Sequence, residues 1–190
     1  ALLMIETDGP EDAIDGITER IRAAAGGEGC LDMTVAQNDV DTQAVWQVRK
    51  ALSPALRTVA PKKINEDVAV PVSRIPQLIT GLDRISREHG IRIVNFGHAG
   101  NGNIHVNLLV NPDNPAEMAA ADRCLDHVFA LVLELDGTLS GEHGIGLVKR
   151  PFVHRELEPN ALQLMAAIKR QFDPDDILNP GKSPAPAGPV

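Results

Sequence analysis

The segment from Gly97 to Asn107, GHAGNGNIHVN, combines residue types that can bind a metal ion. Its glycines permit a tight turn and a close approach of the backbone to a ligand. His98 lies in this turn, while His105 and Asn107 follow in a strand-like pattern and project from the same face. Two histidines joined in this way can converge on one ion. Because ligation needs a third partner, a glycine-rich hairpin with exposed histidines is the alternative.

A second glycine-rich segment, SGEHGIG from Ser140 to Gly146, contains a candidate third ligand. Glu142 and His143 are adjacent within it. Two histidines and one carboxylate form a common open metal site that zinc, manganese or iron would fit. Such an ion can bind an α-hydroxyl and lower its pKa, and a histidine can then take the proton. We therefore expect His98, His105 and Glu142 as ligands and His143 as the base. The alternative is a loop of solvated charges.

A substrate acid would need a cation, and Arg49 is the candidate. Arg49 precedes Ser53 by one helical turn, so both side chains can reach one ligand from the same face. An arginine side chain binds a carboxylate through two parallel hydrogen bonds. A solvated arginine on an amphipathic helix is the alternative.

The other histidines and the two cysteines are expected to be structural. His89 closes a helix, where a cation suits the helix dipole, and the same structural role is expected for His127 and His154. Cys30 and Cys124 are too far apart for a CxxC pair, so we expect two reduced, mostly buried thiols.

The composition is typical of a soluble globular protein and excludes several classes. The 190 residues are 43% hydrophobic and 23% charged, and the formal charge is −8, which disfavours a nucleic-acid binder. No apolar run approaches the ~20 residues of a transmembrane helix, and we expect no signal peptide. We therefore expect a cytoplasmic protein without a transmembrane segment.

Hydrophobic periodicity predicts a mixed fold of the α+β class. Hairpin-connected strands mixed with helices favour two ferredoxin-like halves that share an antiparallel sheet covered by helices. The tail at 183–190, SPAPAGPV, is predicted to be disordered. We expect strands at residues 2–6, 31–35, 67–72, 91–96 and 104–110, helices that begin near Pro10, Asp41, Ser73 and Asn114, and a last helix at 159–172.

Three motifs together resemble a known family. GHAGNGNIHVN, SGEHGIG and DPDDILNPGK, which ends at Lys182, are similar to the C-terminal domain of FAD-linked oxidases of the vanillyl-alcohol oxidase type. The nearest branch contains D-lactate dehydrogenase, D-2-hydroxyglutarate dehydrogenase and the glycolate oxidase FAD subunit. The resemblance implies that residues 1–182 form a substrate- and metal-binding cap domain. It also implies that an N-terminal FAD-binding domain is absent from this chain, which begins without a Met.

The resemblance assigns roles to individual residues of this sequence. It implies FAD and a divalent metal, zinc or manganese, as cofactors. His143 would deprotonate the 2-hydroxyl while a hydride passes to the flavin. The other matched positions are the metal ligands His98, His105 and Glu142, the substrate-binding residues Arg49, Ser53 and Asn107, and Asn179, which would approach the flavin.

Three functions remain open at this point. The first is part of a flavin-dependent dehydrogenase that oxidises a D-2-hydroxy acid to the 2-oxo acid and is inactive without its FAD domain. The others are a stand-alone metal-dependent hydrolase and a non-catalytic binding module. Asn65 stands where some 2-hydroxyglutarate enzymes have a Lys, which counts against that substrate. The sequence does not identify the 2-hydroxy acid or the electron acceptor. An electron acceptor in a membrane would bring the protein to the membrane surface. A homodimer is compatible with the sequence.

Overall fold

The computed structural model describes residues 1–182, which fall into two compact units that divide at Ala55 and Leu56. Helices and one antiparallel sheet make up the chain, so the expected α+β class is confirmed. The tail at 183–190, predicted to be disordered, lies outside the described residues.

The second unit is built around a three-stranded sheet. Its strands are β1 (Lys62–Ala69), β2 (Arg92–His98) and β3 (Asn103–Val110), in the order β1-β3-β2. Both outer strands pair antiparallel with β3. β1 and β2 are joined through a helix, and β3 is inserted between them, which is the split β-α-β arrangement of ferredoxin-like folds. The predicted order β-α-β-β-α is therefore confirmed for this part of the chain.

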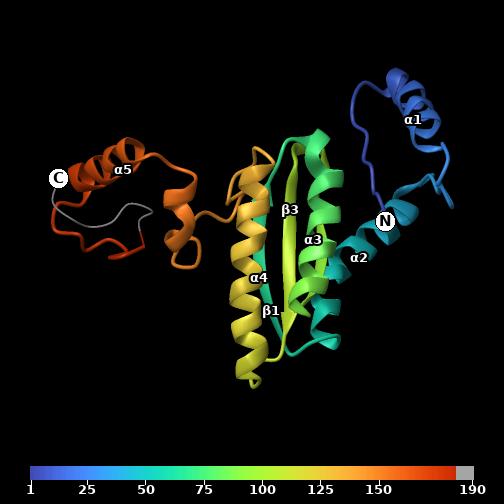
Figure 1. The fold of residues 1–190 in the computed structure, drawn as a ribbon. Helices are drawn as coiled ribbons and strands as arrows, with labels where there is room; N and C mark the ends of the chain where they lie inside the picture. The colour runs from blue at the N-terminus through green and yellow to red at the C-terminus, as the bar shows by residue number, and fades with distance from the viewer. Residues whose placement is uncertain (183–190) are drawn as a thin grey trace. The chain divides into compact units, whose positions relative to one another are not determined.

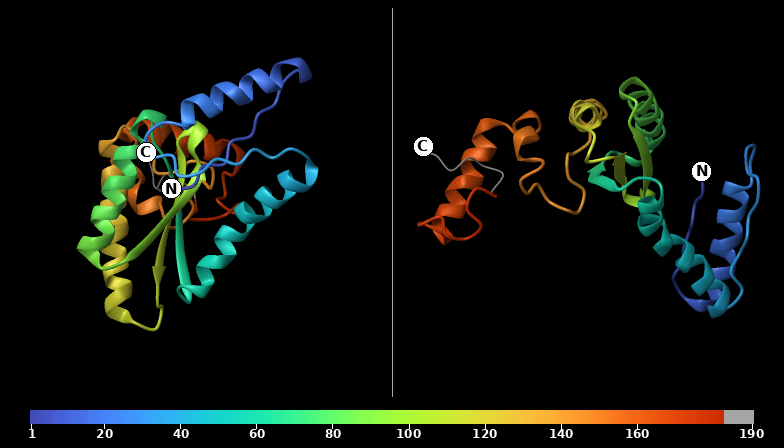
Figure 2. Two further views of the ribbon diagram at one scale, coloured as in Figure 1. Left: turned by 90° about the vertical axis from the view of Figure 1, so that its right-hand side faces the viewer. Right: turned by 90° about the horizontal axis from the view of Figure 1, so that it is seen from below.

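Two helices cover one face of this sheet. α3 (Ile75–His89) and α4 (Pro115–Glu134) lie side by side over the strands, and both are on the same side of the sheet (Figures 1 and 2). Alternate residues of β3, including Val106 and Leu108, belong to the core that packs with these helices. Because side chains alternate along a strand, His105 and Asn107 project from the opposite face. The main core side chains are Val68, Leu78, Leu82, Ile85, Ile104, Val106, Leu108, Val110, Val128, Phe129 and Val132.

The helix ends follow the sequence at Asn114 and Gly90 but not at Ser73. The Asn114 side chain accepts hydrogen bonds from the backbone N–H groups two and three residues further on. Gly90 ends α3 in the left-handed conformation, at φ 66°. The expected cap at Ser73 is wrong: residues 72–74 form a 3-10 turn, and the helix starts later, without a side-chain cap. Pro76, at the start of α3, has no N–H to donate to such a cap.

The first unit contains helices but no strand. α1 (Glu11–Ala25) and α2 (Asp39–Ala55) bury none of their residues. The strands predicted at 2–6 and 31–35 are wrong, because neither segment pairs with another strand. An apolar segment becomes a strand only where a partner accepts its backbone hydrogen bonds. The sheet thus contains the strands of only one predicted half. Cys30, expected to be buried, is exposed here.

The remaining elements follow α4. They are a short 3-10 helix at Arg150–Arg155 and α5 (Pro159–Phe172), which confirms the predicted last helix. Asp173 closes α5 because its carboxylate accepts hydrogen bonds from Lys169 and from backbone N–H groups of the following turn. Within residues 1–182, no helix combines the length and the apolar composition that crossing a bilayer requires.

Candidate active site and metal centre

Three predicted metal ligands meet at one end of the sheet. His98 is the last residue of β2, His105 lies on β3, and Glu142 comes from the loop after α4. The Glu142 Oε1 atom is 3.2 Å from His105 Nε2 and 3.9 Å from His98 Nε2. Ligand atoms of all three residues lie within 4.8 Å of one another. The structure therefore brings together the ligand set that the sequence predicted from distant segments.

His143 lies beside this cluster. Its ring stacks on that of His105, with centroids 5.2 Å apart and planes 20° from parallel. Its Nε2 atom is 3.8 Å from Glu142 Oε1, and its Nδ1 atom is 3.4 Å from Asp67 Oδ1. The His143 side chain is about half exposed, while His105 is buried. A group bound at the cluster can therefore reach a histidine that is oriented by a carboxylate.

Asp67 holds the loop that contains Glu142 and His143. Its Oδ2 atom accepts hydrogen bonds from the backbone N–H of Glu142 and, at 3.0 Å, from that of His143. The loop is also tied to β1 by paired backbone hydrogen bonds between Ala69 and Thr138. In the sheet register, Asp67 lies directly opposite His105. One carboxylate thus fixes the loop next to the strand histidine.

Lys149 neutralises this carboxylate from the protein interior. Its Nζ atom donates to Asp67 Oδ1 at 2.5 Å and to the Asp67 carbonyl at 2.7 Å, and it lies 3.8 Å from Glu66 Oε2. The side chains of Lys149 and Asp67 are 3% and 0% exposed. Burial alone would raise the pKa of Asp67, but hydrogen bonds from Lys149 and the two loop N–H groups lower it to about 2. Burial raises the pKa of Glu66, and the positive charge of Lys149 offsets only part of this increase.

The cluster has the properties that a divalent ion requires. Burial is the main cause that lowers the pKa of His105, with the Glu142 charge acting in the opposite direction, so the neutral form that ligates metals is favoured. His105 Nδ1 is buried and has no hydrogen-bond partner within the described residues. Two imidazoles and one carboxylate leave further coordination positions open. The donor set of the three residues therefore fits an open metal site, one that leaves positions for further ligands.

Two glycines allow the segments to approach this closely. A Cβ atom on Gly102, which has a φ of 79°, would collide with the carbonyl oxygen of Val70. A Cβ atom on Gly141 would collide with the Asn103 side-chain amide and approach Asp67. At these two positions, one in each motif, contacts of the backbone with its neighbours explain why glycine is present.

Asn107 shares the histidine face of β3 but is fully buried. Its Nδ2 atom donates to the Val94 carbonyl at 3.0 Å and to the His105 carbonyl at 3.2 Å. Its Oδ1 atom has no partner among the described residues. This oxygen is a free acceptor beneath the site, and a substrate reaches it only if the residues above it move.

The remaining predicted site residues belong to other parts of the chain. Arg49 and Ser53 are partly buried on α2, in the first unit. Asn179 is exposed, has a positive φ of 50°, and accepts a hydrogen bond from the Lys182 N–H. The four-residue cluster of His98, His105, Glu142 and His143 is therefore the part of the predicted site that the structure assembles.

Sequence reasoning missed Asp67 and Lys149. The available signal was the acidic pair Glu66-Asp67 at the start of a segment that otherwise reads as a buried strand. Charged residues are rarely fully buried without a partner. The pair therefore predicts a buried cationic partner, but periodicity alone does not identify Lys149 among the 18 lysines and arginines.

Comparison with known proteins identifies the family of this chain. The model of the family described as "FAD linked oxidases, C-terminal domain" matches residues 1–183. This chain belongs to that family. The resemblance noted from the three motifs is therefore confirmed, and the FAD-linked oxidase domain extends over both units of the structure.

Three curated relatives of this FAD-linked oxidase domain illustrate the kinds of enzyme that it resembles. Two of them match almost all of the chain, and the third matches four fifths of it. "Glycolate oxidase subunit GlcD" of Bacillus subtilis (strain 168) is 35% identical over 96% of this chain and 39% of its own length. "D-lactate dehydrogenase" of Anaerostipes hadrus is 33% identical over the same shares. "D-2-hydroxyglutarate dehydrogenase" of Stutzerimonas stutzeri (strain A1501) is 34% identical over 80% of this chain and 33% of its own length. The chain thus spans about two fifths or less of these relatives.

Proposed function

We propose that this domain is the substrate- and metal-binding part of a flavin-dependent dehydrogenase or oxidase that converts a D-2-hydroxy acid to the 2-oxo acid. The observation that supports this most strongly is the meeting of His98, His105 and Glu142, with His143 stacked alongside. The relatives named for glycolate, D-lactate and D-2-hydroxyglutarate share the same substrate chemistry, an α-hydroxy carboxylate.

In this proposal His98, His105 and Glu142 hold one divalent ion, zinc or manganese. When bound, such an ion lowers the pKa of a hydroxyl group that it contacts and neutralises the charge that develops on the oxygen. The chain's own contribution is the geometry. His105 is fixed within the sheet, and the Glu142 backbone is held by Asp67, so two ligands are oriented before a substrate arrives.

His143 is the proposed base. It removes the proton of the substrate hydroxyl, while the hydrogen on C2 leaves with its electron pair. A bound flavin supplies the acceptor for this hydride. His143 Nδ1 faces Asp67 Oδ1 at 3.4 Å, an arrangement that orients the ring and stabilises the protonated imidazole. Proton and hydride thus leave the same carbon–oxygen unit, which becomes the carbonyl of the product.

The other predicted residues complete the proposal. Arg49 and Ser53 would bind the substrate carboxylate, Asn107 would accept a substrate hydrogen bond, and Asn179 would approach the flavin. Residues 1–182 would act together as the cap domain of the enzyme. FAD would be bound mainly by a domain that is not part of this chain.

Rapid mixing of the flavin-loaded enzyme, in which this domain is joined to an FAD-binding domain, with D-lactate, glycolate or D-2-hydroxyglutarate in the absence of oxygen tests the proposal. We expect one of these acids to bleach the flavin absorbance. His143→Asn should slow the bleaching by about 10²–10⁴-fold, as loss of a general base does. His154→Asn, a substitution at an exposed histidine outside the cluster, is the matched control and should leave the rate unchanged. Failure to bleach with any 2-hydroxy acid would contradict the proposal, and flavin-independent hydrolysis of an ester or amide would favour a hydrolase.

A further inference from the structure

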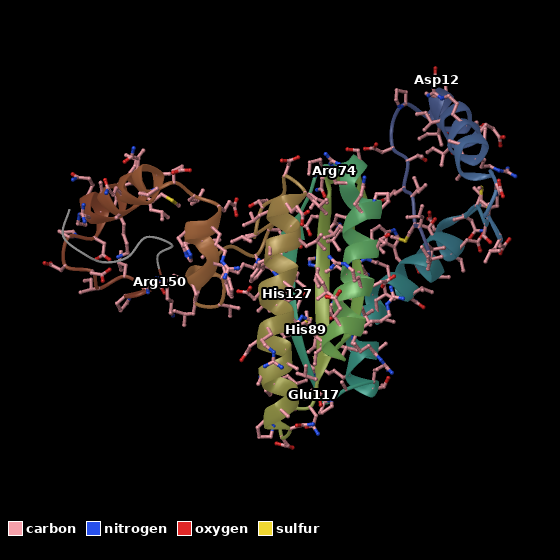
Figure 3. All side chains as sticks on the ribbon, viewed as in Figure 1. Asp12, Arg74, His89, Glu117, His127 and Arg150 are labelled. Carbon is pink, nitrogen blue, oxygen red and sulfur yellow. The ribbon has the colours of Figure 1, made fainter. Side chains whose placement is uncertain are left out.

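The helical layer contains a second pair of histidines that the candidate active site does not use. His89 is the last residue of α3, and His127 lies on α4. Figure 3 labels both on these neighbouring helices. Their rings meet edge to face with centroids 4.7 Å apart, and His89 Nε2 is 2.8 Å from His127 Nδ1. The two lone-pair positions therefore converge on one point between the helices.

Glu88 adds a carboxylate to this pair. Its ligand oxygen and the two histidine nitrogens all lie within 4.8 Å of one another. Within the described residues its side chain pairs with Arg84 at 3.4 Å across one exposed helical turn, and ion pairs of this kind are weak. Glu88 can therefore leave Arg84 at little cost. The nearby carboxylate of Asp126 is held by Arg155 at 2.6 Å, so we do not count it among the ligands.

We propose that Glu88, His89 and His127 form a second metal site, for a late first-row divalent ion such as Zn²⁺, that links α3 to α4. Two imidazole nitrogens and a carboxylate oxygen suit zinc, copper or nickel, whereas magnesium and calcium prefer oxygen ligands alone. Water molecules would complete the coordination on this exposed surface. The proposal does not depend on the proposed function, because these residues lie on the helical layer and share no ligand with the active-site cluster.

The geometry needs only a small adjustment to hold the ion. Zinc binds histidine nitrogen at about 2.0–2.1 Å, so two nitrogens in tetrahedral positions are about 3.4 Å apart. The His89–His127 nitrogens are 2.8 Å apart, a distance at which one ring donates a hydrogen bond to the other. Rotation of exposed His127 can widen the gap by the required half ångström. As the ion binds, the nitrogen that donates this hydrogen bond gives up its proton, to the solvent or to the other nitrogen of its own ring, so that both facing nitrogens offer a lone pair to the ion.

A bound ion would connect the end of α3 to the middle of α4. The ion would bind the folded state and not the unfolded one, because only folding brings together His89 and His127, which are 38 positions apart in the sequence. The domain should therefore become more stable as free zinc rises.

Isothermal titration of the chain with Zn²⁺ tests the site in a background that disables the other cluster. In the His98→Asn, Glu142→Gln variant only His105 of the three proposed active-site ligands remains, and we expect one equivalent of zinc at micromolar free metal. Adding His127→Asn should abolish this equivalent, and adding His154→Asn, the matched control, should keep it. Equal stoichiometry with and without His127 would overturn the proposal, as would no zinc binding in the background variant.

Long-range ¹H–¹⁵N spectra of the unmutated chain provide a second measurement that does not depend on the folding of any variant. Zinc should shift the resonances of His89 Nε2 and His127 Nδ1 and leave those of His154 in place. Unchanged resonances of this pair, while those of His98 and His105 shift, would show that only the active-site cluster binds zinc and would overturn the proposal. Such a result would leave the proposed function intact.

Discussion

Asp67 determines the geometry of the candidate site more than any ligand does. A ligand contributes one atom, whereas this carboxylate binds the backbone of the Glu142–His143 loop, faces the His143 ring and pairs with Lys149. The four residues that the sequence predicted were found because histidines and acids between glycines are conspicuous. Asp67 and Lys149 were not, because their roles arise only when segments 82 positions apart pack together.

Removing the Asp67 charge should weaken both the fold and ion binding at the proposed metal site. Asp67→Asn leaves Lys149 buried without a full counter-charge, and breaking a buried pair from one side costs about 3–5 kcal/mol of the free energy of unfolding. The loop that contains Glu142 also loses its anchor, so divalent-ion affinity should fall by about 10–100-fold. Urea denaturation and metal titration measure the two effects.

Asp126→Asn is the matched control for this substitution. It removes the same charge from an ion pair of similar length, with Arg155 at 2.6 Å, but at the surface. We expect a loss of at most about 1 kcal/mol. The interpretation of the buried pair is wrong if the two variants are equally stable.

The two cysteines should differ sharply in reactivity. Burial raises the pKa of the Cys124 thiol to about 11, whereas Cys30 is exposed. Near pH 8 roughly one Cys124 in a thousand is the reactive thiolate. A thiol reagent such as dithionitrobenzoate should therefore label one cysteine quickly in the folded chain and both after denaturation. Labelling of both at the same rate, or persistence of the fast phase in Cys30→Ser, would contradict this assignment.

Secondary-structure elements were predictable where their partners lie nearby in the sequence. The helix periodicity of α3 and α4 and the hairpin of β2 and β3 were sufficient to predict the β-α-β-β-α unit. The segments at 2–6 and 31–35 failed because their apolar patterns specify burial but not a partner. Sequence patterns thus predict an element, while its pairing depends on which edge is available.

The turn between β2 and β3 should tolerate a methyl group at one glycine and reject it at another. Gly102→Ala would place a Cβ against the Val70 carbonyl at a positive φ, so we expect a loss of at least about 2 kcal/mol. Gly100→Ala, two residues earlier, meets no atom within 4 Å and should change stability by less than about 0.5 kcal/mol. Thermal unfolding compares the two, and similar melting temperatures would show that the turn is not packed as described.

The end of α5 should make the domain sensitive to acid. Hydrogen bonds from Lys169 lower the pKa of Asp173, burial opposes them, and the N–H groups of Leu178 and Ile177 lower the pKa further. A carboxyl whose pKa is lower when folded stabilises the protein above its unfolded pKa of about 3.9, and this stabilisation is lost as the pH falls through the folded value.

Asp173→Asn should therefore lower stability at neutral pH and flatten its decline below about pH 4 relative to the unmutated chain. Chemical denaturation across this pH range measures the difference between the two curves. Because other acids titrate equally in both proteins, parallel curves would mean that Asp173 does not contribute as the structure indicates.

At the scale of the whole molecule, the chain belongs to the family of FAD-linked oxidase C-terminal domains. The family match over residues 1–183 covers both units, including a first unit whose helices bury none of their own residues. The proposed metal ligands and the proposed base belong to the second unit, and the predicted carboxylate-binding residues Arg49 and Ser53 belong to the first.

Anomalous X-ray diffraction from crystals of the chain grown with Zn²⁺ would locate a metal ion bound by His98, His105 and Glu142. We expect an anomalous peak about 2.0–2.2 Å from these three side chains, with His143 next to it but not bound to it. Well-ordered density for these side chains with no anomalous peak between them, or a peak ligated by His143 in place of Glu142, would contradict this expectation.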